Sequence, residues 1–143
     1  MIKHILAAID GSETSRKAGR FAADLARQTG AKLTLLLVLE PPAVFSIAPL
    51  DAYAVAKNRM APETVAAARQ ALAQIEHDLP AKQAETAVEI GRAADTILDR
   101  AASLAVDHIV VGARGHGAGT RWLLGSVSDR VIHHAQCPVT VVR

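Results

Sequence analysis

Apolar positions along this chain follow two different spacings. Short strand-like runs occur at 3–10, 32–40, 85–90, 107–113 and 138–143. The run 32–40 is continuously apolar from Leu35 to Leu39, as expected of a strand covered on both faces. Between these runs, apolar residues recur every three or four positions, which predicts helices over 12–30, 62–79, 92–105 and 126–136. The chain therefore alternates strand and helix from end to end.

This alternation predicts the fold class. Strands joined through helices form a parallel sheet with right-handed crossovers and with helices on both faces. No internal repeat interrupts the pattern, so we expect one Rossmann-like α/β domain over residues 1–143. Ligands of such sheets bind beyond the carboxyl ends of the strands, at the point where the strand order reverses.

Local signals predict the limits of individual elements. Ser12 is a suitable N-cap for the first helix, and Gly30 is a suitable stop after its last turn. Phe21 falls on the same helical stripe as its small apolar neighbours, so we expect it on the inner face of that helix. The stretch 41–61 contains prolines and is poor in regular pattern until about Leu50 or Pro62, and it is predicted to be the longest loop.

The composition indicates what the core is made of and argues against a membrane protein and a nucleic-acid-binding protein. Half of the 143 residues are hydrophobic (50%) and only 3% are aromatic, so the core must be built from Ala, Val, Leu and Ile. A single cysteine, Cys137, and no apolar run long enough for a membrane span lead us to expect a cytoplasmic protein with no membrane contact. The net charge is +2 and basic residues are scattered, which argues against nucleic-acid binding.

The segment after the fourth predicted strand carries the candidate chemistry. Unpaired N–H groups and a partial positive charge at a helix N-terminus bind anions, and a helix is predicted to start near Gly125 and Ser126. Ser128 would add a hydroxyl donor and Arg114 a positive charge, while Ser126 and Asp129 have the spacing of a capping box. The Walker lysine is absent, and no G-x-G-x-x-G fits.

The segment does contain G-x-x-G, nine residues and then G-S, in the run from Gly112 to Ser126. This arrangement resembles the nucleotide-binding signature of the universal stress protein family. The resemblance covers the chain except for about 43–62. One difference is Ala93, where the family often has proline; at the start of a helix we expect this to change little.

The resemblance implies a sheet with strand order 3-2-1-4-5 and a site for ATP, or for ADP or AMP, with Mg²⁺ bound through the phosphates. Asp10 matches the carboxylate that contacts the ribose, Ala8 and Ile9 match the adjoining backbone, and Val38 matches the position beside adenine. The positions that match the ribose and phosphate contacts are Val111, Gly112, Gly115, Gly125, Ser126, Val127 and Ser128.

We therefore expect a nucleotide-dependent regulatory module of a stress response that acts through a protein partner. The resemblance also implies a homodimer that pairs through 138–143. No nucleophile with a base and no positioned pair of carboxylates indicates catalysis. His133 and His134 would point about 100° apart on a helix, which disfavours a shared metal ion. Two alternatives stay open: a weak ATPase on the same scaffold, and a chaperone-like dimer that binds no nucleotide.

Overall fold

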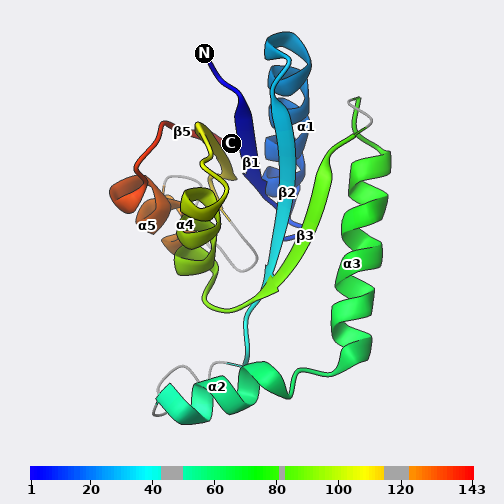
Figure 1. Ribbon diagram of the computed structural model, residues 1–143, viewed down its shortest axis with the longest axis vertical. Helices are drawn as coiled ribbons and strands as arrows, with labels where there is room; N and C mark the ends of the chain where they lie inside the picture. Colours follow the sequence, from blue (N-terminus) through cyan, green and yellow to red (C-terminus); the bar gives the residue numbers. More distant parts are fainter. Residues whose placement is uncertain (43–49, 81–82, 115–122) are drawn as a thin grey trace.

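The computed structural model describes residues 1–42, 50–80, 83–114 and 123–143. Its strands are β1 (His4–Ala8), β2 (Lys32–Leu39), β3 (Glu85–Ile90), β4 (His108–Gly112) and β5 (Val139–Val142). Its helices are α1 (Glu13–Thr29), α2 (Leu50–Asn58), α3 (Pro62–His77), α4 (Ala93–Ser103) and α5 (Ser126–His134). The strands form a parallel sheet in the order β3-β2-β1-β4-β5, which confirms the predicted fold class and strand order (Figure 1).

Helices cover both faces of this sheet. Helices α1 and α3 pack on one face, and α4 and α5 pack on the other (Figure 1). The alternation of side chains along a strand explains the two cores: Ile5 and Ala7 of β1 face the α1 side, whereas Leu6 between them faces α4. The carboxyl ends of the parallel strands meet at one end of the sheet, which is where residues from distant parts of the chain come together.

Helix α1 begins and ends as its sequence predicts. Ser12 is the N-cap and accepts a hydrogen bond from the Ser15 N–H at 3.3 Å, and Gly30 ends the helix with a left-handed φ of 72°. The expectation for Phe21 is wrong, because this side chain is 44% exposed. The buried residues of the helix are all small: Thr14, Ser15, Gly19 and the alanines at 18, 22, 23 and 26. A Cβ on Gly19 would lie 3.1 Å from Ile9 Cδ1. The helix therefore lies so close to the sheet that no aromatic ring fits beneath it.

Of the two limits expected for the irregular stretch after position 41, the later one, Pro62, is wrong, since Leu50–Asn58 forms α2. Its alanines fall on alternate positions, 52, 54 and 56, so no amphipathic stripe marked the helix. Alanine, leucine and lysine have high intrinsic helix propensity, which accounts for a helix without such a stripe. Helix α2 lies beyond the carboxyl ends of the strands, apart from both helical layers (Figure 1).

Asp107 joins the start of β1 to the segment before β4. Its Oδ2 accepts hydrogen bonds from the backbone N–H groups of Lys3 (2.8 Å) and His4 (2.9 Å). These bonds, the one from Lys3 first, lower the pKa of Asp107 below its ordinary value because they favour the charged carboxylate. The resulting stabilisation is complete above the ordinary pKa of an aspartate and is lost as the pH falls through the lowered pKa of the folded state.

Asp107→Asn is therefore expected to lower the free energy of unfolding at neutral pH. The difference between wild type and variant is expected to shrink as the solution is acidified. The amide oxygen can still accept both N–H groups, but the side chain no longer titrates. Urea unfolding at a series of pH values measures the difference, and Asp99→Asn, which removes an exposed carboxylate of α4, is the matched control. A gap of constant size across the acid range would contradict the assignment.

Two features of the fold concern contact with a membrane and with a second copy of the chain. Among the described residues, no helix is both long enough and apolar enough to cross a membrane. Strand β5 is the outermost strand of the described sheet beside β4. Pairing of two copies through 138–143 stays a prediction.

Candidate functional site

A cavity of about 740 Å³ opens at the carboxyl ends of β1, β2 and β4. The strand order reverses here, because the chain leaves β1 for a helix on one face of the sheet and leaves β4 for a helix on the other. Besides the strand ends, the described walls include the start of α5 and the first turns of α3 and α4. The cavity is thus at the position expected for the ligand site of a parallel α/β sheet.

The structure brings most of the predicted site residues together around this cavity. Eleven of the twelve line it: Ala8, Ile9, Asp10, Val38, Val111, Gly112, Arg114, Gly125, Ser126, Val127 and Ser128. The twelfth, Gly115, lies outside the described residues. That these residues contact a ligand remains a prediction.

A tight turn presents Asp10 at the end of β1. Its Oδ1 accepts a hydrogen bond from the Ser12 N–H at 2.8 Å, and its own N–H donates to Ser15 Oγ at 3.3 Å. Gly11 between them has φ of 84°, in the left-handed region that favours glycine. These contacts hold the Asp10 carboxylate at the exposed edge of the cavity, where it can accept hydrogen bonds from a ligand.

The start of α5 forms the facing part of the wall. Gly125 is its N-cap residue, and no side-chain hydrogen bond caps the helix, so the capping box expected from Ser126 and Asp129 does not form. The first regular helical bond runs from the Asp129 N–H to the Gly125 carbonyl at 2.9 Å. The three N–H groups before it have no acceptor within the helix. Together with the exposed Ser126 hydroxyl, they make this end of α5 suited to an anion.

Gly112 and Ser128 shape the end of β4. Ser128 is only 3% exposed, and its hydroxyl lies within hydrogen-bond distance of the carbonyls of Gly112 (2.9 Å) and Ala113 (3.1 Å). A Cβ on Gly112 would come within 2.7–2.8 Å of Oγ1 and backbone atoms at Thr14 and Ser15. Both residues therefore hold the strand end between α1 and α5, a role that sequence reasoning missed.

Sequence reasoning also missed the contribution of Glu40, the first residue after β2. Its Oε1 accepts a hydrogen bond from the Ala93 N–H at 2.7 Å, at the first residue of α4. A proline at position 93 could not donate this bond, so the difference from the family pattern matters more than expected. The place of Glu40 at the end of the predicted strand 32–40 was the available signal. The other unpredicted lining residues are Ser15, Leu36, Leu37, Leu39, Thr64, Ala68 and Ile97.

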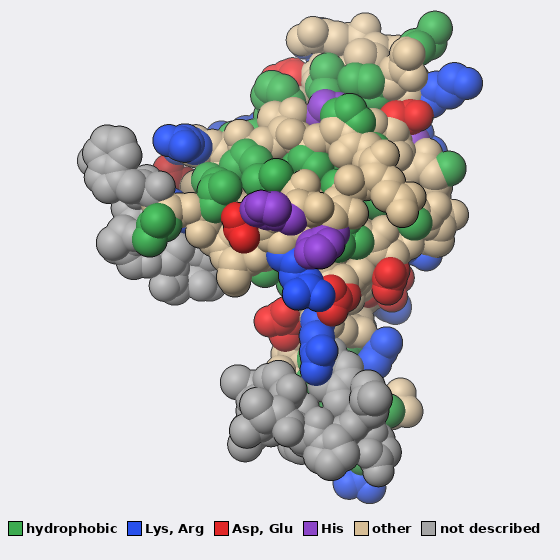
Figure 2. Space-filling model, turned by 90° about the vertical axis from the view of Figure 1, so that its left-hand side faces the viewer, with side chains coloured by type: hydrophobic (Ala, Val, Ile, Leu, Met, Phe, Trp, Pro, Cys, Tyr) green, Lys and Arg blue, Asp and Glu red, His purple; other side chains and the backbone are tan. Residues whose placement is uncertain are grey.

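The outer face over α4 and α5 carries charges of both signs side by side (Figure 2). Arg130 contacts Asp95 at 3.0 Å through both Nε and a terminal nitrogen. His133 and His134 are exposed, and the His133 ring contacts the carbonyl oxygen of Asp129 at 2.8 Å. Within the described ranges, no group of three or more His, Cys, Asp or Glu residues is arranged to hold a metal ion.

The model of the universal stress protein family matches residues 1–143. The chain belongs to the universal stress protein family. A universal stress protein of Thermus aquaticus is 34% identical over 143 residues, which cover 100% of both chains.

Solved universal stress proteins share the fold. The universal stress protein UspA of Lactobacillus plantarum has a TM-score of 0.76 and 28% identity, with 99% of this chain and 98% of that chain covered. A universal stress protein of Archaeoglobus fulgidus, solved in complex with dAMP, has a TM-score of 0.65 and 22% identity, with 100% and 98% covered. The second likeness concerns the fold alone.

Proposed function

We propose that this universal stress protein binds an adenine nucleotide, ATP first among the candidates, and that its occupancy regulates a stress response through a protein partner. One observation carries the proposal. A single cavity is lined both by the Asp10 carboxylate and by the uncapped start of α5 at Gly125. A hydroxyl-binding group and an anion-binding group in one cavity are what a sugar phosphate requires.

The remaining wall suits the other parts of a nucleotide. Val38 and its apolar neighbours on β2 provide a surface for a base, and the Arg114 side chain adds positive charge beside the phosphate end. Mg²⁺ would depend mainly on the phosphates, because the described residues offer no cluster of three ligands of their own. The dAMP complex of the Archaeoglobus fulgidus protein supports the capacity of this fold for an adenine nucleotide.

We further propose that residues 1–143 act as one domain in a cytoplasmic homodimer. The apolar strand Val139–Val142 at the edge of the described sheet supports this arrangement, because an unpaired apolar edge is prone to pair with another strand. A dimer would also offer a partner protein a surface that both copies form. The nucleotide would then act as the signal that alters this surface.

Asp10→Ala is expected to weaken ATP binding by about 10-fold to 100-fold, because a charge-assisted hydrogen bond contributes about 1.5–3 kcal/mol. Asp10→Asn keeps an acceptor for the Ser12 N–H, so it separates the loss of charge from the loss of the turn. Titration calorimetry with ATP, ADP and AMP, with and without Mg²⁺, measures both variants. Asp24→Asn on α1, outside the cavity lining, is the matched control.

The outcomes of this titration separate the alternatives. Unchanged affinity in both Asp10 variants would contradict the site, even if wild type binds ATP. No heat with any of the three nucleotides would contradict the proposed function and favour a chaperone-like dimer. Steady phosphate release by wild type would add a weak ATPase activity to the binding.

A further inference from the structure

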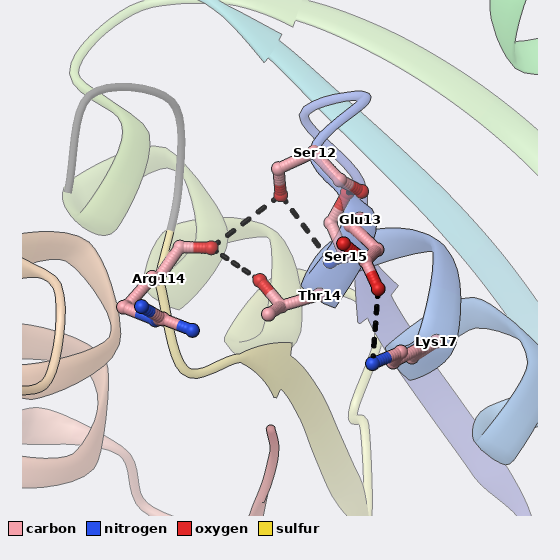
Figure 3. Close-up of polar contacts among 6 residues, drawn as sticks. All are labelled: Ser12, Glu13, Thr14, Ser15, Lys17 and Arg114. Carbon is pink, nitrogen blue, oxygen red and sulfur yellow. Dashed lines mark hydrogen bonds and ion pairs between the residues drawn. The ribbon is translucent and has the colours of Figure 1, made fainter. Parts of the chain in front are cut away.

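The first turn of α1 contacts the chain directly after β4. The Thr14 hydroxyl donates to the Arg114 carbonyl, and Ser12 Oγ lies 3.4 Å from the same oxygen (Figure 3). These residues are 100 and 102 positions apart in the sequence. The Arg114 carbonyl therefore receives side-chain donors from a helix at the other end of the chain.

This junction is closely packed. Thr14 is 8% exposed and Ser15 is 3% exposed. Gly112, two residues before Arg114, faces the same turn of α1 so closely that a Cβ would lie 2.8 Å from the Ser15 nitrogen. The contact between α1 and the end of β4 thus leaves little freedom for the backbone on either side of it.

Arg114 belongs to the cavity, whereas Thr14 and Ser12 do not line it. Arg114 is also the last described residue before 115–122, the segment that carries the second glycine of the motif. Its carbonyl is held from the α1 side, while Ala113 before it accepts the Gly125 N–H at 2.7 Å from the α5 side. The direction in which the chain leaves β4 is set by both helices.

We propose that Thr14 is a positioning residue for the nucleotide site, with the Ser12 hydroxyl as a second donor at a longer distance from the Arg114 carbonyl. The inference rests on the proposed function and assigns a role to a residue that touches no ligand. Thr14 holds Arg114 in the geometry that the bound nucleotide requires before the nucleotide arrives. Such preorganisation lowers the cost of ordering the site on binding.

Thr14→Val is expected to raise the Kd for ATP by about fivefold, because it removes one hydroxyl donor and lowers the population of the binding-competent geometry. Thr14→Ser keeps the hydroxyl and is expected to restore wild-type affinity. Thr29→Val is the matched control: it removes a hydroxyl that contacts the Leu25 carbonyl at 2.8 Å in the last turn of the same helix. It is expected to lower the melting temperature but to leave the Kd unchanged.

A second measurement needs no ligand. Trypsin cleaves after arginine, so release of the Arg114 carbonyl in Thr14→Val is expected to speed cleavage at that bond several-fold, with no such change in Thr29→Val. Wild-type affinity and wild-type cleavage in Thr14→Val would overturn the inference, as would equal effects of the two valine variants. If wild type binds none of the three nucleotides while Thr14→Val still speeds cleavage, the proposed function fails and the anchoring of Arg114 stands.

Discussion

Gly112→Ala is expected to lower the free energy of unfolding by about 1–3 kcal/mol, the usual range for overpacking a well-packed site. The added Cβ would lie 2.7 Å from Thr14 Oγ1 and 2.8 Å from two backbone atoms of α1. Backbone atoms at the start of a helix cannot move out of a steric clash as the end of a flexible side chain can. Either β4 or α1 must therefore shift, and the cavity that both of them border changes shape.

Urea unfolding measures this loss, and ATP titration below the melting transition measures its effect on the site. Gly19→Ala is the matched control, because its Cβ would meet the end of the Ile9 side chain at 3.1 Å and alanine favours the helix. We expect Gly19→Ala to stay within about 1 kcal/mol of wild type. A Gly112→Ala protein as stable as wild type would show that the end of β4 is less tightly held than the contacts indicate.

Gly125→Val is expected to weaken ATP binding at least about 10-fold and to lower the free energy of unfolding by about 1 kcal/mol, because valine is a poorer N-cap than glycine. The backbone at Gly125 has φ of −65° and ψ of 154°, an extended conformation that valine adopts without strain. The change acts instead on the cavity, because a branched side chain at a lining position would stand between a phosphate and the first N–H groups of α5.

Gly125→Ser provides a sharper control at the same position. Serine is at least as good an N-cap as glycine, so the melting temperature is expected to stay equal or rise slightly. The serine hydroxyl would occupy N–H groups that the proposed phosphate needs, so affinity is expected to fall. Wild-type affinity in both variants, measured by calorimetry, would remove the start of α5 from the proposed site.

Much of the fold followed from patterns that depend on neighbouring residues alone. Short runs rich in apolar residues predicted all five strands of the described sheet, and cap residues such as Ser12 and Gly30 predicted the limits of α1. Two predictions about the fold failed, one because of close packing and one because intrinsic helix propensity formed a helix without an apolar stripe. Phe21 has the spacing of an inner residue, but α1 lies too close to the sheet to admit it. Helix α2 forms without the apolar stripe that sequence reasoning looked for.

The candidate site also has a part that the sequence predicts and a part that it does not. A motif with fixed spacing, together with Asp10 after the first strand, was enough to name residues that line one cavity, because parallel topology brings strand ends to one edge. The bond from Ala93 to Glu40 joins residues 53 positions apart, and no local pattern predicts such a partner.

The sequence by itself determined the alternation of strands and helices, the family signature and the end of the sheet where the candidate site lies. Only the tertiary structure decided what some of those residues do there. At Gly112 there is no room for a Cβ, because the first turn of α1 packs against it. The Ser128 hydroxyl donates a hydrogen bond to the Gly112 carbonyl at the end of β4. The physical reason is that spacing along a chain reports local conformation, whereas close packing depends on which distant atoms arrive at the same place.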